Sequence, residues 1–232
     1  MGASAQGSFA QPLIFGIKTG ISGSFFTKDV NEFDPSSDFK NPVFQRFFRP
    51  TGQFGVTVDY MLKERVSLGA EILYVGRGTG YRRKNNNVLI IGGNGSQDAY
   101  DYFRYKIDYI ELPFTINYNV LDPSSDDWLT GYGGLAPAIA VSKGVSLTNA
   151  QPNAGPWKGQ PNQSAELTGV RTFNASAVAG IQYGSVPAFL GYYVDIRATY
   201  ALLPVFTADQ DVNGDNLNTR MLALTFGIGL KF

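Results

Sequence analysis

The side chains in this sequence that are best suited to acid–base chemistry are Glu71 and Glu111. Two carboxyl groups on different strands can work as a general acid and a general base. The chain has no histidine and no cysteine, however, so it lacks the usual general base, the commonest metal ligand and any thiolate metal site. We therefore expect the two glutamates to be ion-pair partners of nearby cations, and we expect no enzymatic activity.

A second candidate is an acidic stretch near the C-terminus in which oxygen-bearing side chains stand at alternate positions. This pattern, with a glycine for the turn, resembles a calcium-binding loop. The bidentate glutamate that should close such a loop is missing, because Arg220 stands in its place. The stretch is either a weak calcium site or an acidic, solvated turn, and we favour the turn; no other cofactor is expected. The candidate ligands are Asp209, Asp211, Asn213 and Asp215.

A third candidate is a basic cluster of Arg82, Arg83 and Lys84. Guanidinium and ammonium groups bind phosphate groups well, but they can equally pair with acidic side chains of neighbouring loops. The sequence leaves both interpretations open. The net charge of the chain is +0, so no overall field attracts nucleic acid, and we expect no nucleic-acid partner.

β-Strands are the elements that must position these side chains. From Leu13 to the end of the chain, apolar and polar residues alternate with a period of two. In the last segment Leu224, Phe226 and Ile228 share one face, whereas a helix would scatter them around its circumference. We predict eight strands, at approximately residues 13–22, 54–60, 66–75, 109–118, 128–143, 171–183, 190–200 and 222–232.

The connections between these strands are of two kinds that alternate along the chain. Three are short, at residues 62–65, 120–127 and 184–188. Four are longer and polar, at residues 26–49, 82–99, 144–170 and 203–218. Short turns at one end and long loops at the other are typical of an antiparallel up-and-down transmembrane β-barrel. We predict a flexible N-terminal segment at residues 1–11 and a single barrel domain at residues 12–232.

Alternation by itself does not say which face points outward, since a soluble lipocalin-like barrel has the same period. Three observations favour a membrane barrel. Charged residues are only 16% of the chain, against about 25% in ordinary soluble domains. The segments allow the roughly 9–11 residues that a tilted strand needs to cross a bilayer. Aromatic residues suited to a membrane interface are predicted near the short turns, at Tyr60, Tyr74, Tyr118, Tyr183 and Phe232.

The predicted polar faces carry four cations and four anions, and no mid-strand charge falls on an apolar face. A charge inside a narrow barrel is costly unless it is paired. The balance therefore predicts a network of ion pairs that plugs the lumen; a narrow channel or a small-ligand-binding barrel is the alternative. The residues of this predicted lumen network are Lys18, Asp59, Glu71, Arg77, Glu111, Asp195, Arg197 and Lys231.

The chain ends in a polar residue, a glycine, an apolar residue and an aromatic residue at fixed spacing. Gly227, Leu230 and Phe232 carry this pattern. It resembles the C-terminal signal by which the barrel assembly machinery reads outer-membrane barrels. We therefore expect a bacterial outer-membrane protein, and an even number of strands places both termini on the periplasmic side.

Four further stretches follow a recognisable pattern: Phe15–Gly20, Val66–Tyr74, Ile107–Pro113 and Gly131–Pro137. Together with the terminal Phe232 they resemble the PorT-like family of bacterial outer-membrane barrels. The resemblance implies an eight-stranded barrel. The namesake of the family is linked to protein secretion, so the resemblance also implies partners among outer-membrane or secretion-complex proteins.

These expectations combine into a structural or accessory subunit that acts through its external loops or its lipid-facing wall. Outer-membrane lipids are expected partners. Among them, the phosphates of lipopolysaccharide would be the ligands of Arg82, Arg83 and Lys84.

Overall fold

The computed structural model describes residues 13–28, 45–92, 95–121, 126–148, 163–185, 190–207 and 218–232. For residues 86–92, 95–98 and 163 the description extends to the backbone only. The strands in this part of the chain are β1 (Leu13–Phe26), β2 (Gln45–Phe47), β3 (Arg49–Lys63), β4 (Val66–Gly92), β5 (Gly95–Glu111), β6 (Phe114–Asn119), β7 (Asp127–Thr148), β8 (Gln163–Glu166), β9 (Phe173–Ser185), β10 (Gly191–Ala201) and β11 (Met221–Lys231). No helix in these ranges is long and apolar enough to cross a membrane.

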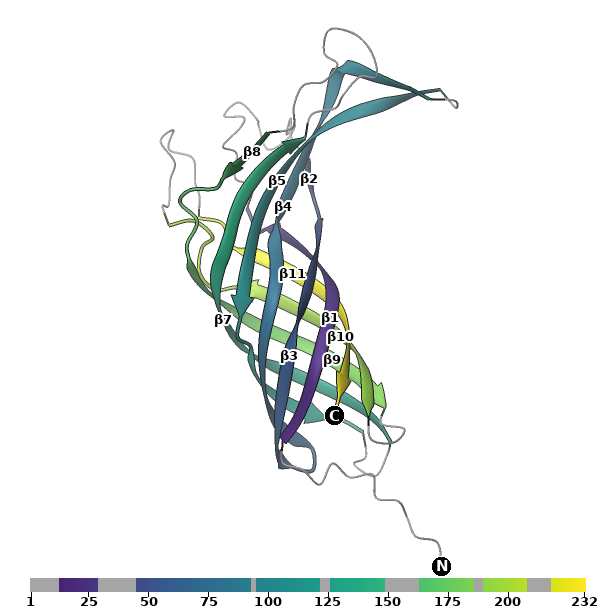
Figure 1. Cartoon of the computed structure of the whole chain (residues 1–232), viewed down its shortest axis with the longest axis vertical. Helices are drawn as coiled ribbons and strands as arrows, with labels where there is room; N and C mark the ends of the chain where they lie inside the picture. The colour runs from purple at the N-terminus through teal and green to yellow at the C-terminus, as the bar shows by residue number, and fades with distance from the viewer. Residues whose placement is uncertain are drawn as a thin grey trace, which may run out of the picture.

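The strands close into a ring, because β1 pairs antiparallel with β3 on one side and with β11 on the other. The order continues through β10, β9 and β7 to β5 and β6, which pair with β4 and so return to β3. β5 and β6 form one strand of the wall, interrupted at Pro113 because proline has no N–H for the ladder. Short β2 and β8 extend the wall beside β4 and β7. The wall thus has the eight antiparallel strands that the sequence predicts (Figure 1).

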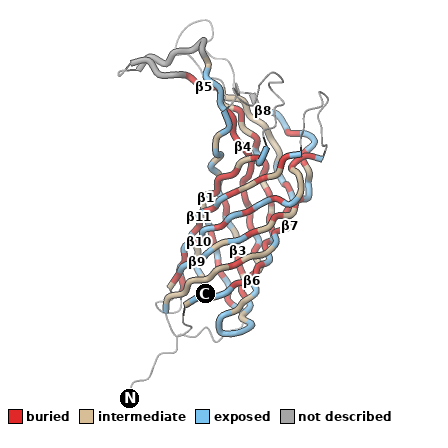
Figure 2. Tube along the Cα trace, turned by 180° about the vertical axis from the view of Figure 1, so that it is seen from behind, coloured by how far each residue is buried: buried red, intermediate tan, exposed pale blue. Residues whose placement is uncertain are grey.

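The apolar face of the wall points outward. On β10 exposure alternates at every residue: Ile196 is 54% exposed, whereas Asp195 and Arg197 are 0% and 1% exposed. The same alternation of buried and exposed positions runs around the barrel (Figure 2). An apolar exterior around a charged interior is the reverse of a soluble barrel and the arrangement of a barrel in lipid. The prediction of a transmembrane barrel is confirmed.

β4 and β5 continue well beyond the wall. They contain 27 and 17 residues, and they pair from Leu73–Glu111 out to Gly92–Gly95, with one irregularity between Lys84 and Leu89 (Figure 1). The predicted long loop at residues 82–99 is therefore wrong, because most of it is a projecting two-stranded hairpin. Clean alternation arises only where one face of a strand is buried, and this ribbon extends past the wall that would bury it.

The beginning of β1 and the end of β11 lie side by side, at the end of the barrel that carries the short turns. Glu64 and Arg65 form the turn between β3 and β4, and the backbones of Phe15 and Phe232 exchange hydrogen bonds of 3.1 and 2.9 Å. Tyr74 does not belong at this end. It is the ninth residue of β4 and stacks on Phe54, 5.3 Å between ring centroids, so its predicted place near a short turn is wrong.

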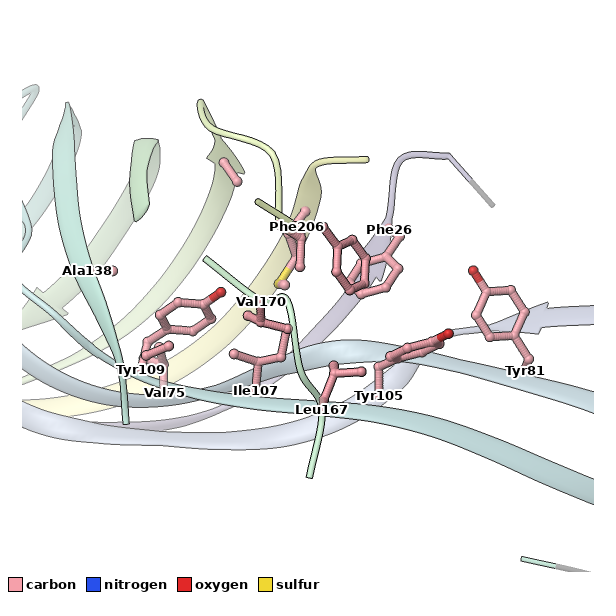
Figure 3. Packing of buried hydrophobic residues seen from close by; sticks show 14 of the residues in the cluster. Phe26, Val75, Tyr81, Tyr105, Ile107, Tyr109, Ala138, Leu167, Val170 and Phe206 are labelled. Atoms are coloured by element: carbon pink, nitrogen blue, oxygen red, sulfur yellow. The ribbon is translucent and has the colours of Figure 1, made fainter. Parts of the chain in front are cut away.

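Much of the interior away from the short turns is apolar. Leu73 and Val75, which interrupt the polar side of the β4 pattern, are both 0% exposed and point inward. They belong to a cluster that includes Phe26, Tyr105 and Phe206 (Figure 3). One part of this cluster fills the barrel mouth, which is the end away from the short turns, and we call it the apolar plug. Its members are Phe26, Tyr105, Ile107, Leu167, Val170, Val205 and Phe206.

Two segments between barrel strands supply much of the apolar plug. Val170 and Phe206 form an isolated antiparallel bridge, and the Arg171 N–H donates to the Val205 carbonyl at 2.8 Å. The Val205 N–H in turn donates to the Thr219 carbonyl at 2.8 Å. These backbone bonds hold the segments across the barrel mouth, where their apolar side chains pack on Phe26 and Tyr105.

Candidate functional site

A charged cluster occupies the centre of the lumen. The Lys18 ammonium on β1 lies 3.0 Å from Asp195 Oδ2 on β10 and 3.5 Å from Glu71 Oε1 on β4. The Arg197 guanidinium, also on β10, donates to the same Glu71 oxygen at 2.7 Å. The Tyr132 hydroxyl on β7 donates to Asp195 Oδ1 at 2.6 Å and accepts from Arg197 Nε at 2.9 Å. Four wall strands are thus joined across the barrel by charge-assisted hydrogen bonds.

A second ion pair lies just below the apolar plug. Arg77 on β4 donates through Nε and Nη2 to the two carboxylate oxygens of Glu111 on β5, each at 3.2 Å. Its Nη1 donates to the Ser22 hydroxyl at 2.6 Å, and Ser22 also accepts from the Thr225 hydroxyl at 3.0 Å. This bidentate geometry fixes Arg77 firmly to β5 and links it to β1 and β11.

A third group lies toward the short turns. The Lys231 ammonium on β11 is 2.8 Å from Asp59 Oδ2 on β3, and Asp59 Oδ1 accepts from the Asn117 side-chain amide at 2.9 Å. Lys231 also lies over the rings of Trp128 and Tyr193, at 4.4 and 5.3 Å from their centroids. The side chains of Lys231 and Asp59 are 14% and 12% exposed, so this group is the wettest of the three.

The structure therefore brings all eight residues of the predicted lumen network inside the barrel. It arranges them as three groups, with each carboxylate within 4 Å of a cation. Glu71 and Glu111 belong to different groups and each is engaged by arginine, so they do not form an acid–base pair. The pairs are Lys18–Asp195, Lys18–Glu71, Arg197–Glu71, Arg197–Asp195, Arg77–Glu111 and Lys231–Asp59.

Sequence reasoning missed Tyr132, which bridges the central cluster, because β7 is rich in glycine and alanine and its facing was uncertain. The glycines around Tyr132 are a sequence signal that could have found it. A Cβ added to Gly180 on the neighbouring strand would lie 2.4 Å from the Tyr132 hydroxyl. A single large aromatic residue between glycines, opposite another glycine, indicates a side chain that needs this space.

Little free volume remains inside the described lumen. One cavity, between Arg77, Tyr109 and Asn174, has about 20 Å³, and another, beside Asp59 and Tyr132, has about 10 Å³. A cavity needs at least about 10–15 Å³ on this measure to hold one water molecule. These spaces suit single waters and are far too small for an organic ligand.

The predicted basic cluster is divided between the two faces of β4. Arg82 and Lys84 are exposed on the outward side, and Arg82 lies over the Tyr100 ring at 5.2 Å. Arg83 lies on the opposite face and pairs with Asp101 at 3.1 Å, as the alternative interpretation expects. A strand sends successive side chains to opposite sides, so three consecutive cations cannot share one face.

Further arginines lie over aromatic rings toward the same end of the barrel. Each places its guanidinium carbon 5.0–5.9 Å from the ring centroid, within cation–π range. The pairs are Arg46–Phe25, Arg104–Tyr102 and Arg220–Tyr200. With Arg82–Tyr100 we call them the arginine–aromatic pairs.

Two predicted sites remain, the calcium site and the C-terminal assembly signal, and the structure describes only the second. Asp209, Asp211, Asn213 and Asp215 lie outside the described residues, so the calcium site stays a prediction; the described residues contain no group of three or more potential ligands. In the terminal strand, Leu230 and Phe232 face outward, 36% and 59% exposed. Gly227 faces the lumen, where an added Cβ would lie 3.7 Å from the Asp195 Cβ.

Residues 5–207 match the family described as outer membrane protein beta-barrel domain. The chain belongs to this family. Together with the apolar exterior and the closed ring, the match places the protein in the bacterial outer membrane. No curated protein matches the chain.

Several solved outer-membrane proteins are similar in fold. OprG from Pseudomonas aeruginosa is 12% identical, with 98% of each chain covered and a TM-score of 0.48. Ail, the attachment invasion locus protein of Yersinia pestis, is 10% identical, with 96% of this chain and 100% of that chain covered and a TM-score of 0.40. Neisserial surface protein A is 13% identical, with 96% and 98% covered and a TM-score of 0.38. At these identities the likeness concerns the fold alone.

Proposed function

We propose that this protein is a closed, non-enzymatic barrel that serves as a structural or accessory subunit of the outer membrane. The observation that carries the proposal is the filling of the lumen along its length. Three groups of paired charges occupy the part toward the short turns, and the apolar plug occupies the mouth. A solute would have to break buried ion pairs and displace packed aromatic side chains to pass.

The short turns and the ends of the ring are proposed to face the periplasm, which puts the projecting hairpin of β4 and β5 outside the cell. The arginine–aromatic pairs would then lie toward the outer surface, where arginine can bind lipopolysaccharide phosphates. Arg82 and Lys84 are the members of the predicted basic cluster that are placed for such contact. The outward Leu230 and Phe232 at the chain end are suited to the barrel assembly machinery.

The resemblance to the PorT-like family supports a finer proposal, that partner proteins belong to an outer-membrane or secretion complex. Mild detergent extraction from native membranes, followed by identification of copurifying proteins, tests it directly. Discrete stoichiometric partners are expected. A barrel that is recovered alone after crosslinking as well as after extraction would contradict an accessory role.

Closure is tested by electrical recording from the purified protein in planar bilayers. We expect no steady single-channel current, and we expect no swelling of liposomes in small solutes. Steady currents or swelling would favour a narrow channel, and saturable uptake of one small solute would favour a ligand-binding barrel.

A further inference from the structure

In the described part of the chain, the barrel wall is parted between β3 and β4. These strands pair as far as Gln53 with Val75, and pairing with β4 resumes only where Phe47 of β2 meets Gly80. Five residues on one side therefore face four on the other, so the regular ladder cannot continue between them. We call these two stretches, residues 48–52 and 76–79, which do not pair with each other, the parted seam.

On the side of β4 that faces β3, side chains take the place of the missing ladder in the parted seam, whereas the other side stays paired with β5. The Thr51 hydroxyl donates to the Gly76 carbonyl at 2.7 Å. The Ser24 hydroxyl accepts from the Gly78 N–H at 2.9 Å and lies 2.8 Å from the Gly78 carbonyl. The Arg49 guanidinium donates to the carbonyls of Arg77 and Tyr105. These bonds offset the lost ladder, so the parting is a stable feature of the wall.

A groove of about 250 Å³ opens on the outer surface along this seam. The lumen cavities hold about 20 and 10 Å³. Counted from Val66, Tyr74 and Gly76 are the ninth and eleventh residues of β4, which is roughly the 9–11 residues a tilted strand needs to cross the bilayer. The groove thus lies at the membrane interface away from the short turns. Its lining is Arg49, Pro50, Thr51, Gly52, Phe54, Tyr74, Gly76 and Asp108.

The groove presents one positive and one negative side chain. Arg49 and Asp108, both in the described part of the chain, face it without approaching within 4 Å as an ion pair. The Asp108 carboxylate lies at the edge of the seam beside Gly76, since a Cβ added to Gly76 would lie 3.4 Å from Asp108 Oδ1. An acid there is costly unless a cation neutralises it. The pair is complementary to a ligand that carries both charges.

The rest of the groove suits the apolar part of an amphiphile. Phe54 is 60% exposed and stacks on Tyr74, and Val56 and Ile72 continue the apolar wall toward the bilayer centre, 52% and 55% exposed. A volume of about 250 Å³ is below the roughly 300–1,000 Å³ of pockets that enclose a whole drug-sized ligand. The groove therefore fits a headgroup whose chains remain outside in the bilayer.

We propose that this groove binds a membrane lipid through a phosphoethanolamine headgroup. The Arg49 guanidinium binds the phosphate, the Asp108 carboxylate accepts from the primary ammonium, and the acyl chains run down over Phe54. The site lies on the outer wall, so it is independent of whether the lumen conducts.

The test uses the whole barrel, purified in detergent and mixed with lipids that have identical acyl chains but different headgroups. Native mass spectrometry measures how many barrels retain one lipid. We expect phosphatidylethanolamine to be retained with an apparent affinity about tenfold above phosphatidylglycerol, which has no cation, and phosphatidylcholine, whose quaternary ammonium cannot donate a hydrogen bond. Free phosphoethanolamine at the same concentration should not compete, because the chains contribute to binding.

Two variants locate the site. Asp108→Asn keeps the shape of the side chain but removes the charge, so retention of phosphatidylethanolamine should fall to the level of phosphatidylcholine. Gly52 lines the groove, and an added Cβ there meets no atom within 4 Å, so a leucine is tolerated by the wall. Gly52→Leu should therefore fill the groove and block it. Gly131→Leu is the matched control: its Cβ also meets no atom within 4 Å, and Gly131 lies on β7, outside the groove lining.

Equal retention of the three lipids by the unsubstituted protein would overturn the proposal. So would a preference that survives both Asp108→Asn and Gly52→Leu, or one that Gly131→Leu removes equally. Effective competition by free phosphoethanolamine would assign the groove to a soluble ligand instead of a lipid. Each variant should still show the heat-modifiable migration of a folded barrel on gels, which separates loss of binding from loss of folding.

Discussion

The two halves of the lumen are filled in different ways. Toward the short turns, side chains of the wall strands meet across the barrel as paired charges, such as Lys18 with Asp195. Toward the mouth, the apolar plug adds residues from segments between strands, such as Val170 and Phe206, to inward residues of the wall. The charged half depends on each partner being present, whereas the plug depends on volume. The difference predicts unequal responses to substitution.

The largest effect is expected in the central cluster. Arg197→Met leaves Glu71 and Asp195 without their shared arginine in a site where Arg197 itself is 1% exposed. Loss of one partner of a buried charge group costs about 3–5 kcal/mol. Urea titration of the barrel refolded in lipid vesicles measures the free energy of unfolding. Adding Glu71→Gln to Arg197→Met should recover at least half of the loss, and no recovery would show that the cost comes from packing.

Truncation in the apolar plug tests the other half. Phe26→Ala removes a ring that contacts Tyr105 and Phe206, with centroids at 5.4 and 6.0 Å, and is expected to cost about 3 kcal/mol. The same urea titration checks the value. Phe26→Leu, which retains most of the volume, should cost about 1 kcal/mol. Equal costs for the two variants would mean that the plug is not closely packed.

A smaller effect is expected at the wetter end of the charged half. Asp59→Asn removes the ion pair with Lys231, but Lys231 keeps its contacts with Trp128 and Tyr193. Water and these rings can stabilise the remaining ammonium, so we expect a loss of about 1–2 kcal/mol. The free energy of unfolding at low and high salt measures it. A loss as large as that of Arg197→Met would contradict the gradient of burial along the lumen.

The smallest effect is expected beyond the barrel wall. Arg83 pairs with Asp101 at 3.1 Å, but its side chain is 48% exposed. Exposed pairs contribute about 0–1 kcal/mol, so Arg83→Gln should change the free energy of unfolding by less than about 1 kcal/mol. The same variant separates stability from binding: Arg83 faces away from Arg82 and Lys84, so lipopolysaccharide binding should weaken less than with Arg82→Gln.

The sequence alone determined the alternation of the strands, their number, and the confinement of charges to one face. These follow from local rules, because each residue of a strand is placed inside or outside by its neighbours and by the cost of a charge in lipid. The same rules did not predict the projecting hairpin. It continues past the barrel wall that buries one face of a strand, so its residues need not alternate between apolar and polar.

Only the tertiary structure decided which charges meet and what fills the mouth. Lys18 and Asp195 are 177 residues apart, and their contact depends on how the ring closes and which inward side chains share one level. The apolar plug and the parted seam depend in the same way on the closed wall. Val170 and Phe206 come from segments without strand periodicity, and Arg49 and Thr51 reach β4 only because the register changes beside them. A pattern with a period of two says which way a side chain points, and closure of the barrel says what it points at.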